Sequence, residues 1–574
     1  TRRRIKAGEK ATFILAVRSW AKCSRPYEYA FSRARWITAE DVENLRIRHL
    51  AWWKRFWSMS EISLDDPVIE QRYYLSKYML ASLSRDPDYP PNILGISTFD
   101  RPAWNGNYKI NYNHQSPYLN LMVSGHFEQS DPHDAPYLKL MEISDEMCKR
   151  LLHHEGLYYP LGLGPDGVVS EALLLHMKSP ALHGALNMIY RYEISQDTKY
   201  AWKVYPYLRG VADFWEKDLV LRDGVYHVVG DGMHERTDGN IRENGVPEDP
   251  VNTLGYLKTF FTWLPQISEV LELDEEKRMK WQEIAQNLAP YPKGTIREIQ
   301  DNPTLWKEAD VKLEDLLPQE MLDKEIYYDE GVGGKWSFHF PGNIMHIYPG
   351  NAVGLGSDPK ELEVARNTVH IHSLVENKLG ELEYKKALER ATDGKKETAA
   401  KHAHFYKAGA FNASNLSCLF FTAAVRTGYD PDIIWKEMRD MITYRGIPNG
   451  FLKENPHGIE QLNTIPDAIQ EMMLQSYEGV IRIFPVWPRK KHPNASFRSF
   501  RAWGGFEVSA SLKDGKIEQV TVLSHKGNTC RVENPWPEKS VIVKYGYSGR
   551  EEVCFGEYLS IELQKEEQVL LSGL

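Results

Sequence analysis

The sequence predicts a mainly helical protein: a toroid of paired helices followed by a small C-terminal β-sandwich. Three observations predict this class. Apolar residues recur with helical spacing through most of the chain between Thr38 and Phe484. Long loops rich in Gly, Pro and Asn join these stretches, and no strand–helix alternation favours a TIM barrel or a Rossmann sheet. From about residue 485 the apolar period changes to the alternation of strands.

Residues 1–38 are predicted to be the end of an N-terminal β-domain and a linker. Residues 11–17 follow a turn at Gly8 and have the composition of a strand. A strand needs neighbours, so we expect a β-domain to precede Thr1, and any targeting signal to lie there.

Residues 39–484 are predicted to form the toroid. Thr38 is a suitable N-cap, and acidic residues follow it in the first helical turn. The loops 228–250 and 331–356 are longer than most connections inside a compact domain, which is typical of functional loops. The other stretches with helical spacing are 67–86, 136–153, 169–194, 198–217, 252–271, 275–288, 359–376, 415–427, 430–443 and 464–477.

Residues 485–574 are predicted to form the C-terminal β-sandwich. Apolar residues alternate over 506–512 and again over 517–522, with an Asp-Gly turn at 514–515 between them. Further strands are expected around 530–532 and 541–543.

Composition excludes several classes of protein. The formal net charge of −9 disfavours a nucleic-acid binder, and no run of about 18 apolar residues could span a membrane. Aromatic residues make up 12% of the chain, which suits sugar binding but equally a large aromatic core. The cysteines are too scattered for a disulfide framework or a structural zinc site. They are Cys23, Cys148, Cys418, Cys530 and Cys554.

Three polar segments are candidates for chemistry. In the first, Asn111 and Asn113 stand two residues apart, so their amides face the same way in an extended segment. Such a pair can hold a water molecule or orient a carboxylate. The alternative is a turn-rich loop in which the two amides satisfy backbone groups.

The second segment, 227–238, follows a short strand and is flexible at Gly230 and Gly232. It carries Asp231, His234 and Glu235, a density of titratable groups that suits general acid chemistry. A solvated charged loop is the alternative.

The third segment contains Glu460 ahead of a helix for which Thr464 is the expected N-cap. The positive end of that helix would favour the ionised, base-competent form of Glu460. Asp467 is assigned to structure, at the capping-box position. Spacing alone does not establish that the three segments meet in space.

From about Trp52 to its C-terminus the chain also resembles glycoside hydrolase family 95, the inverting α-L-fucosidases, some of which act as α-L-galactosidases. The Trp-rich segment 52–57 and the Asn pair preceded by Trp104 belong to the shared pattern. The remaining matching segments are 84–87, 90–95, the loop with Glu235, 347–350, 471–476 and 483–488.

The resemblance implies an (α/α)6 toroid between two β-domains. It also implies that Glu235 is the general acid, that Asn111 and Asn113 orient the attacking water, and that Glu460 is the base. Glu460 stands eleven residues before Glu471, where the family has the Asp of an Asp-Gly-Asn-Phe-Gly motif. Here that motif is Glu-Gln-Leu-Asn-Thr, and the acid follows Met-His rather than Ser-Pro. A divergent subgroup with a different sugar is therefore expected.

No metal ion and no cofactor are expected for this chemistry. The implied partner is an oligosaccharide or polysaccharide, without nucleic acid or a membrane span, and the implied location is secreted or periplasmic. Candidate sugar contacts are Trp104, His183, Asn187, Asp231, His234, His339 and Asn343. For His183 and Asn187, one helical turn apart, a satisfied polar pair on a helix is equally expected.

Three other functions stay open on the sequence. A glycoside phosphorylase on a related toroid would need only one acid, with phosphate in place of the activated water. A polysaccharide lyase would use Tyr or His bases and cationic side chains. A catalytically silent sugar-binding protein would fit the altered motif around Glu460.

Overall fold

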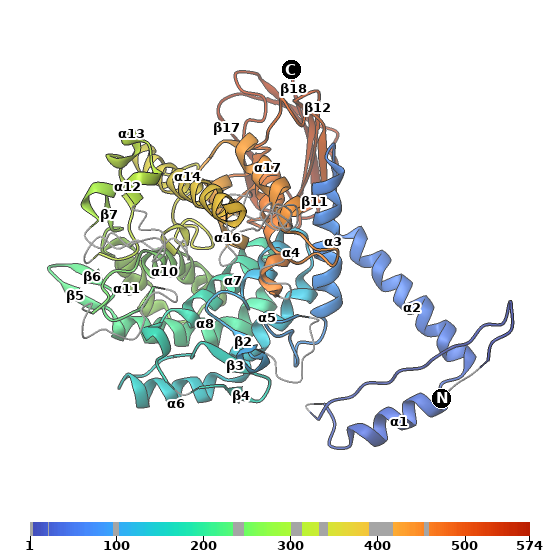
Figure 1. Ribbon diagram of the computed structural model, residues 1–574. Helices are drawn as coiled ribbons and strands as arrows, with labels where there is room; N and C mark the ends of the chain where they lie inside the picture. The colour runs from blue at the N-terminus through green and yellow to red at the C-terminus, as the bar shows by residue number, and fades with distance from the viewer. Residues whose placement is uncertain are drawn as a thin grey trace. The chain divides into compact units, whose positions relative to one another are not determined.

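The computed structural model (Figure 1) describes most of the chain. The described residues form two compact units, Thr1–Met59 and Ser60–Leu574. The described ranges are 4–20, 22–95, 103–170, 172–233, 246–299, 313–331, 342–389, 417–452 and 458–574.

The first unit contains helices α1 (Pro26–Trp36) and α2 (Ala39–Ser58). The predicted N-cap of α2 is confirmed. The Asp41 backbone N–H donates to Thr38 Oγ1 at 3.1 Å, and the Thr38 backbone N–H donates to the Asp41 carboxylate at 2.9 Å. This reciprocal capping box satisfies two backbone donors at the start of the helix.

The strand predicted at residues 11–17 is not formed. The segment is irregular, and its apolar side chains are exposed, with Phe13 at 86% and Leu15 at 89%. A β-strand exists only where a neighbour accepts its backbone hydrogen bonds, and none of the described strands pairs with this segment. Strand-like composition was therefore not sufficient.

The second unit is built mainly from helices. Several begin and end within a few residues of the predicted bounds, because apolar spacing reports directly on the buried face of a helix. The helices are α3 (Pro67–Leu83), α4 (Leu119–Val123), α5 (Phe127–Lys139), α6 (Met141–Leu151), α7 (Pro180–Ser195), α8 (Thr198–Asp218), α10 (Val251–Leu271), α11 (Glu275–Gln286), α12 (Leu313–Leu316), α13 (Gln319–Leu322), α14 (Pro359–Glu389), α16 (Ser417–Arg426), α17 (Pro431–Asp440) and α18 (Thr464–Met473).

The order of packing closes a ring, which confirms the predicted toroid. The helix α4 packs on α7, α7 on α10, and α10 on the short helix η6 (Gly342–Ile344). From η6 the ring continues through α14, α16 and α18, and α18 returns to α4. Further helices pair with members of this ring: α8 with α7, α11 with α10, and α17 with α16.

Some helix boundaries differ from the prediction. The stretch 136–153 is divided, since α5 ends at Lys139 and α6 begins at Met141. The helix predicted over 169–194 begins only at Pro180, because Leu175 and His176 ahead of it have left-handed backbone angles that a continuous right-handed helix excludes. The stretch 464–477 leaves its helix after Met473, where residues 474–475 form a strand instead.

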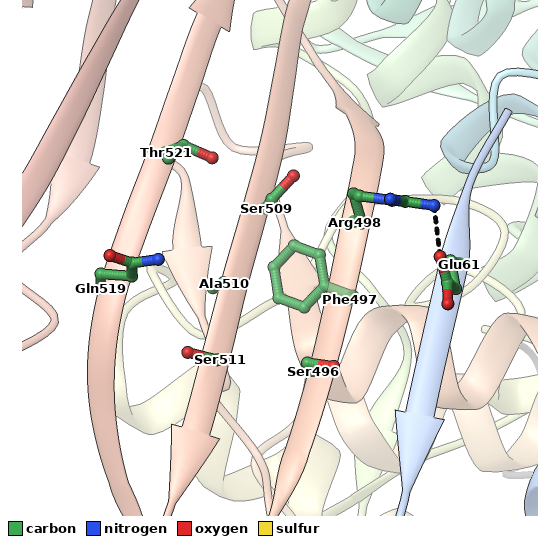
Figure 2. Close-up of a pocket in the computed structure, with 9 residues that line it drawn as sticks. All are labelled: Glu61, Ser496, Phe497, Arg498, Ser509, Ala510, Ser511, Gln519 and Thr521. Atoms are coloured by element: carbon green, nitrogen blue, oxygen red, sulfur yellow. Dashed lines mark hydrogen bonds and ion pairs between the residues drawn. The ribbon is translucent and has the colours of Figure 1, made fainter. Parts of the chain in front are cut away.

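The C-terminal region forms the predicted β-structure, organised around a seven-stranded sheet of order β1-β11-β12-β13-β18-β15-β16. The edge strand β1 comes from residues far ahead of the rest and pairs antiparallel with β11, which the sequence did not predict. Figure 2 shows the two strands side by side, joined by the Glu61–Arg498 ion pair. The strands are β1 (Glu61–Leu64), β11 (Ala495–Ala502), β12 (Phe506–Lys513), β13 (Lys516–Ser524), β14 (Thr529–Glu533), β15 (Val541–Tyr545), β16 (Glu551–Cys554), β17 (Tyr558–Glu562) and β18 (Glu567–Gly573).

Short strands tie the loops of the toroid together in pairs or threes. Among the described residues, no helix has the length and hydrophobicity needed to cross a bilayer. The short strands are β2 (Tyr108–Lys109), β3 (Gly162–Gly164), β4 (Gly167–Val168), β5 (Val220–Arg222), β6 (Val225–His227), β7 (Lys293–Gly294), β8 (Ile326–Tyr327), β9 (Leu474–Gln475) and β10 (Arg482–Ile483).

One apolar core runs from the toroid into the C-terminal sheet. The Trp503 ring, after β11, lies 5.7 Å from the Tyr190 ring of α7 and 4.8 Å from the Trp263 ring of α10, measured between centroids. The five cysteines are all unbonded thiols. The fold is therefore held by packing rather than by disulfides.

Candidate active site

Glu460 is a buried carboxyl group directly ahead of α18, where the sequence placed it. It lies on the short helix η11 (Ile459–Leu462) and is 1% exposed. The Ile459 backbone N–H donates to the Ile93 carbonyl at 3.1 Å, which fixes this turn to the loop after α3. Burial, and next the negative charge of Glu460, raise the pKa of the Cys418 thiol in the first turn of α16. The Glu460 carboxyl group therefore lies close to the start of α16.

The loop with Asn111 and Asn113 reaches the same region. Both amides are buried, at 3% and 7% exposure. The loop continues into the short helix η2 (Ser116–Tyr118), which packs against η11. Within it, Ser116 Oγ lies 3.2 Å from Cys418 Sγ, so the loop and Glu460 share Cys418 as a neighbour. The structure thus brings together two of the three segments singled out in the sequence.

Two polar residues of α7 adjoin this loop. Asn187 is fully buried, and its amide N–H donates to the Gln115 carbonyl at 2.9 Å. One turn earlier, His183 is 3% exposed, and its ring centroid is 5.0 Å from that of Tyr256 on α10. The inner face of the toroid is therefore polar beside the Asn loop.

The sequence analysis missed Asn252 and Tyr256, the partners of this polar face on α10. They stand one helical turn apart on the buried side of α10, and that spacing was the available signal. Asn252 Oδ1, Tyr256 OH and Asn187 Oδ1 are buried and have no hydrogen-bond partner among the described residues. Buried polar atoms of this kind are ready to bind hydroxyl groups.

Both carboxylate oxygens of Asp231 accept hydrogen bonds from the protein. Its two carboxylate oxygens accept hydrogen bonds at 2.6 Å, one from the Lys178 backbone N–H and one from the Thr253 hydroxyl. Burial raises the pKa of Asp231 to about 6, although both hydrogen bonds oppose that rise. The Lys178 ammonium also donates to the Val229 carbonyl at 3.0 Å. The backbone around residues 229–232 is thereby fastened to the segment before α7 and to α10.

The remaining predicted site residues differ in placement. Asn343 is buried, donating to the Tyr327 carbonyl at 2.9 Å and accepting from His372 Nε2 at 2.7 Å. Burial lowers the pKa of His372 to about 3, which keeps its ring neutral. Trp104 is 55% exposed on a loop. His234, Glu235 and His339 lie outside the described residues.

Asp467 does not occupy the capping box expected for α18. The N-cap position is Asn463 rather than Thr464, and it makes no side-chain cap. Asp467 instead accepts a hydrogen bond from the Thr422 hydroxyl on α16 at 2.8 Å. Burial, and next the charge of Glu471, raise the pKa of Asp467 to about 7. Asp467 therefore joins α18 to α16 and does not cap its own helix.

One group among the described residues has the spacing of a metal site. The donor atoms of His227, Glu248 and Asp249 lie within 4.8 Å of one another. Each carboxylate of the cluster already has a nitrogen partner. His227 Nδ1 lies 2.7 Å from Asp249 Oδ2, and Arg222 pairs with Glu248 at 2.6 Å. It lies where the two ends of the loop 228–249 meet.

Two family models match the chain. The model described as the glycosyl hydrolase family 95 catalytic domain matches residues 22–380. The model described as the glycoside hydrolase family 95 C-terminal domain matches residues 475–569. None of the curated proteins compared with the chain matches it.

Solved structures are similar to the chain at low sequence identity. A protein described as a kojibiose phosphorylase from the human microbiome is 11% identical at a TM-score of 0.45, with 94% of this chain and 65% of that one covered. An α-L-rhamnosidase from Dictyoglumus thermophilum is 12% identical at 0.42, covering 89% and 50%. The α-L-rhamnosidase of Streptomyces avermitilis is 11% identical at 0.40, covering 89% and 42%. The chain therefore spans less than two thirds of the length of each.

Proposed function

This chain belongs to glycoside hydrolase family 95, and from that premise we propose that it removes a terminal α-linked neutral or deoxy sugar, of the α-L-fucoside or α-L-galactoside type, with inversion. Family membership makes it a glycoside-active enzyme with a carbohydrate substrate. We also propose a secreted or periplasmic location, in line with the family resemblance.

The observation that carries this proposal is the convergence of Glu460 with the Asn111–Asn113 loop around Cys418. A general base must be within reach of the water it activates, and fixed amides can hold that water in place. In the proposed role, ionised Glu460 takes a proton from a water that Asn111 and Asn113 orient. The start of α18 supplies partial positive charge that favours the ionised base.

Glu235 is the proposed general acid, which gives its proton to the departing glycosidic oxygen. Asp231 and Lys178 fix the backbone of residues 229–232, shortly before Glu235 in the chain. This supports the role, because a general acid must be held at a fixed position relative to the oxygen that it protonates. An inverting mechanism requires the two carboxyl groups to stand about 6.5–9.5 Å apart, leaving room for the water.

The polar face of α7 and α10 is the proposed binding surface for the sugar. Asn187, Asn252 and Tyr256 offer acceptors and donors to ring hydroxyls from two neighbouring helices, and the His183 ring lies beside Tyr256. An arrangement of fixed polar groups of this kind distinguishes epimers, since a misplaced hydroxyl leaves a buried group unpaired. Further sugar contacts are proposed for Trp104, Asp231, His234, His339 and Asn343.

The test is a panel of nitrophenyl α- and β-glycosides with plant and host oligosaccharides, assayed with and without inorganic phosphate. We expect phosphate-independent hydrolysis of an α-L-fucoside or α-L-galactoside, and proton NMR showing the inverted anomer as the first product. Glu460→Gln and Glu235→Gln should each lower kcat by about 10²–10⁴-fold.

Glu193→Gln is the matched control. Glu193 is buried on α7, and burial raises the pKa of its carboxyl to about 8, so an amide replaces a neutral group at pH 7. Normal activity in this variant would exclude a general effect of altering buried carboxyls. Turnover only with phosphate would assign a phosphorylase, an unsaturated product a lyase, and binding without turnover a sugar-binding protein. Each of these results contradicts the proposal.

A further inference from the structure

A second place in the protein combines an exposed aromatic ring with hydrogen-bonding side chains, in the C-terminal sheet. A cleft of about 560 Å³ lies between the turn 545–550, which joins β15 to β16, and the segment 562–567, which joins β17 to β18. This volume is within the range of small-ligand sites, about 300–1,000 Å³. None of the residues assigned to the candidate active site lines it.

Tyr547 is the aromatic group of this cleft. Its hydroxyl donates to the Glu566 carbonyl at 2.7 Å, so the ring is tied across the cleft from one wall to the other. The residue is nevertheless 65% exposed. A tethered but exposed ring loses little conformational entropy when a ligand stacks on it, which is the physical advantage of a pre-organised platform.

Polar side chains surround that ring. Glu562 is the last residue of β17, and Gln564 stands two residues after it. Both side chains are exposed and line the cleft, whereas Leu563 between them is buried. On the other side, the Arg550 guanidinium lies over the Tyr545 ring, 4.1 Å from its centroid, and pairs with Glu552 at 3.5 Å. The cleft therefore presents a carboxylate, an amide and a guanidinium beside a ring.

The cleft drawn in Figure 2 provides a contrast on the same sheet. It measures about 270 Å³ and is lined by Ser, Thr and Gln side chains of β11, β12 and β13. Its single aromatic residue, Phe497, is 2% exposed. It has polar groups but no accessible ring on which an apolar surface could stack.

We propose that the Tyr547 cleft is a non-catalytic binding site for a neutral oligosaccharide chain. The apolar face of a sugar ring stacks on an aromatic ring, while its hydroxyls need both donors and acceptors, and the cleft supplies both. An acidic chain would be repelled by the exposed Glu562, and the charge of Arg550 is already paired with Glu552, so a neutral chain is favoured. The class of ligand rests on the proposed function, since a site that holds a polysaccharide serves an enzyme acting on its terminal sugars.

The test is affinity electrophoresis in gels containing soluble xyloglucan, galactomannan or pullulan, with acidic pectate as a fourth probe. The full chain carries Glu460→Gln, so that the polysaccharide is not consumed. We expect retardation by at least one neutral polymer, and about three- to tenfold weaker binding after Tyr547→Ala. Gln564→Ala should weaken it as well. Phe555→Ala is the matched control, because Phe555 is 77% exposed but does not line the cleft.

Equal retardation of the parent and Tyr547→Ala, equal weakening by Phe555→Ala, or stronger binding to pectate overturns the proposal. So does a lack of retardation by every neutral polymer. In the otherwise unaltered enzyme, Tyr547→Ala should leave turnover of a small nitrophenyl glycoside unchanged. If no glycoside is turned over, the proposed function fails while the electrophoresis still decides whether the cleft binds sugar.

Discussion

At the scale of single residues, the buried carboxyl groups differ in how the protein surrounds them. Burial raises the pKa of Asp231 to about 6 and that of Glu193 to about 8, because the hydrogen bonds that these carboxyl groups accept only partly offset the cost of burying a charge. Burial by itself would also raise the pKa of Asp134. Hydrogen bonding to His133 and the charge of Arg191 outweigh that effect, so the pKa of Asp134 is lowered. Neighbours, rather than residue type, decide which of these groups are ionised at neutral pH.

The length of the proposed base gives the first prediction. Glu460→Asp keeps the charge but withdraws the carboxylate by about one methylene from the water held by Asn111 and Asn113. A misplacement of about 1 Å costs about 10²-fold, so we expect kcat to fall by about 10–10²-fold, less than in Glu460→Gln. Steady-state kinetics on the best glycoside measure it. Equal or faster turnover in Glu460→Asp would contradict a base positioned by this backbone.

Asp231 gives a prediction of pH dependence. Its folded-state pKa, about 6, lies above the ordinary value of 3.8, so the folded state holds the proton more tightly. Stability is therefore lost as pH rises from about 4 to about 6, by about 3 kcal/mol, and is retained below about pH 4. In Asp231→Asn this loss should be absent. Urea unfolding at pH 4 and pH 7 measures the difference.

The exposed Asp166→Asn serves as control for that experiment, since its side chain is 81% exposed. We expect its change in unfolding free energy between the two pH values to match that of the unaltered protein. A wild-type-like pH dependence in Asp231→Asn would contradict the role given to burial.

At the scale of elements, the ring depends on close approach between α10 and the segment 342–350. A Cβ added to Gly255 would stand 2.3 Å from His346 Cβ and 2.7 Å from its backbone Cα. Such separations do not occur without a backbone shift. Ala is normally the better residue inside a helix, but at position 255 only Gly leaves room for His346.

Gly255→Ala is predicted to destabilise the protein by about 1–3 kcal/mol, because overpacking outweighs the gain in helix propensity. The Tm from thermal unfolding, and the midpoint in urea, report the change. Gly167→Ala is the control, since no atom lies within 4 Å of the added Cβ there. A stabilised Gly255→Ala protein would show that α10 and His346 are more loosely packed than the structure indicates.

At the scale of the whole molecule, residues 60–574 form one compact unit in which the toroid and the C-terminal sheet share a core. Trp503 is one such contact, between Tyr190 and Trp263. The edge strand β1 adds a second link, because it precedes the helices in the chain but pairs within the sheet. The helices and the sheet are therefore expected to unfold together.

Trp503→Ala is predicted to cost about 3–5 kcal/mol and to lower the unfolding midpoints of both parts by the same amount. Circular dichroism at the helical minimum follows the toroid, and hydrogen exchange of β12 and β13 follows the sheet. Trp202→Ala, at a site that is 53% exposed on α8, should change neither midpoint appreciably. Faster exchange in the sheet with an unchanged helical midpoint would contradict a shared core.

Much of the fold could be predicted from the sequence, because its signals are local. Helical spacing places α8, α10 and α11 within a residue or two, and the Thr38 capping box follows from residues three apart. The change of period near residue 485 likewise identifies the C-terminal sheet. The prediction failed where a segment needed a partner strand, as in residues 11–17.

The sequence by itself determined which segments are helices or strands and which loops carry polar groups, since these depend on neighbours a few residues away. Only the tertiary structure decided that Glu460 lies near the Asn111 loop, that Asn252 and Tyr256 complete a polar face, and that β1 joins a distant sheet. Such contacts depend on packing between segments that are far apart in the sequence. The hydrogen bond from Ser116 to Cys418, 302 positions along the chain, is set by the closure of the ring rather than by local pattern.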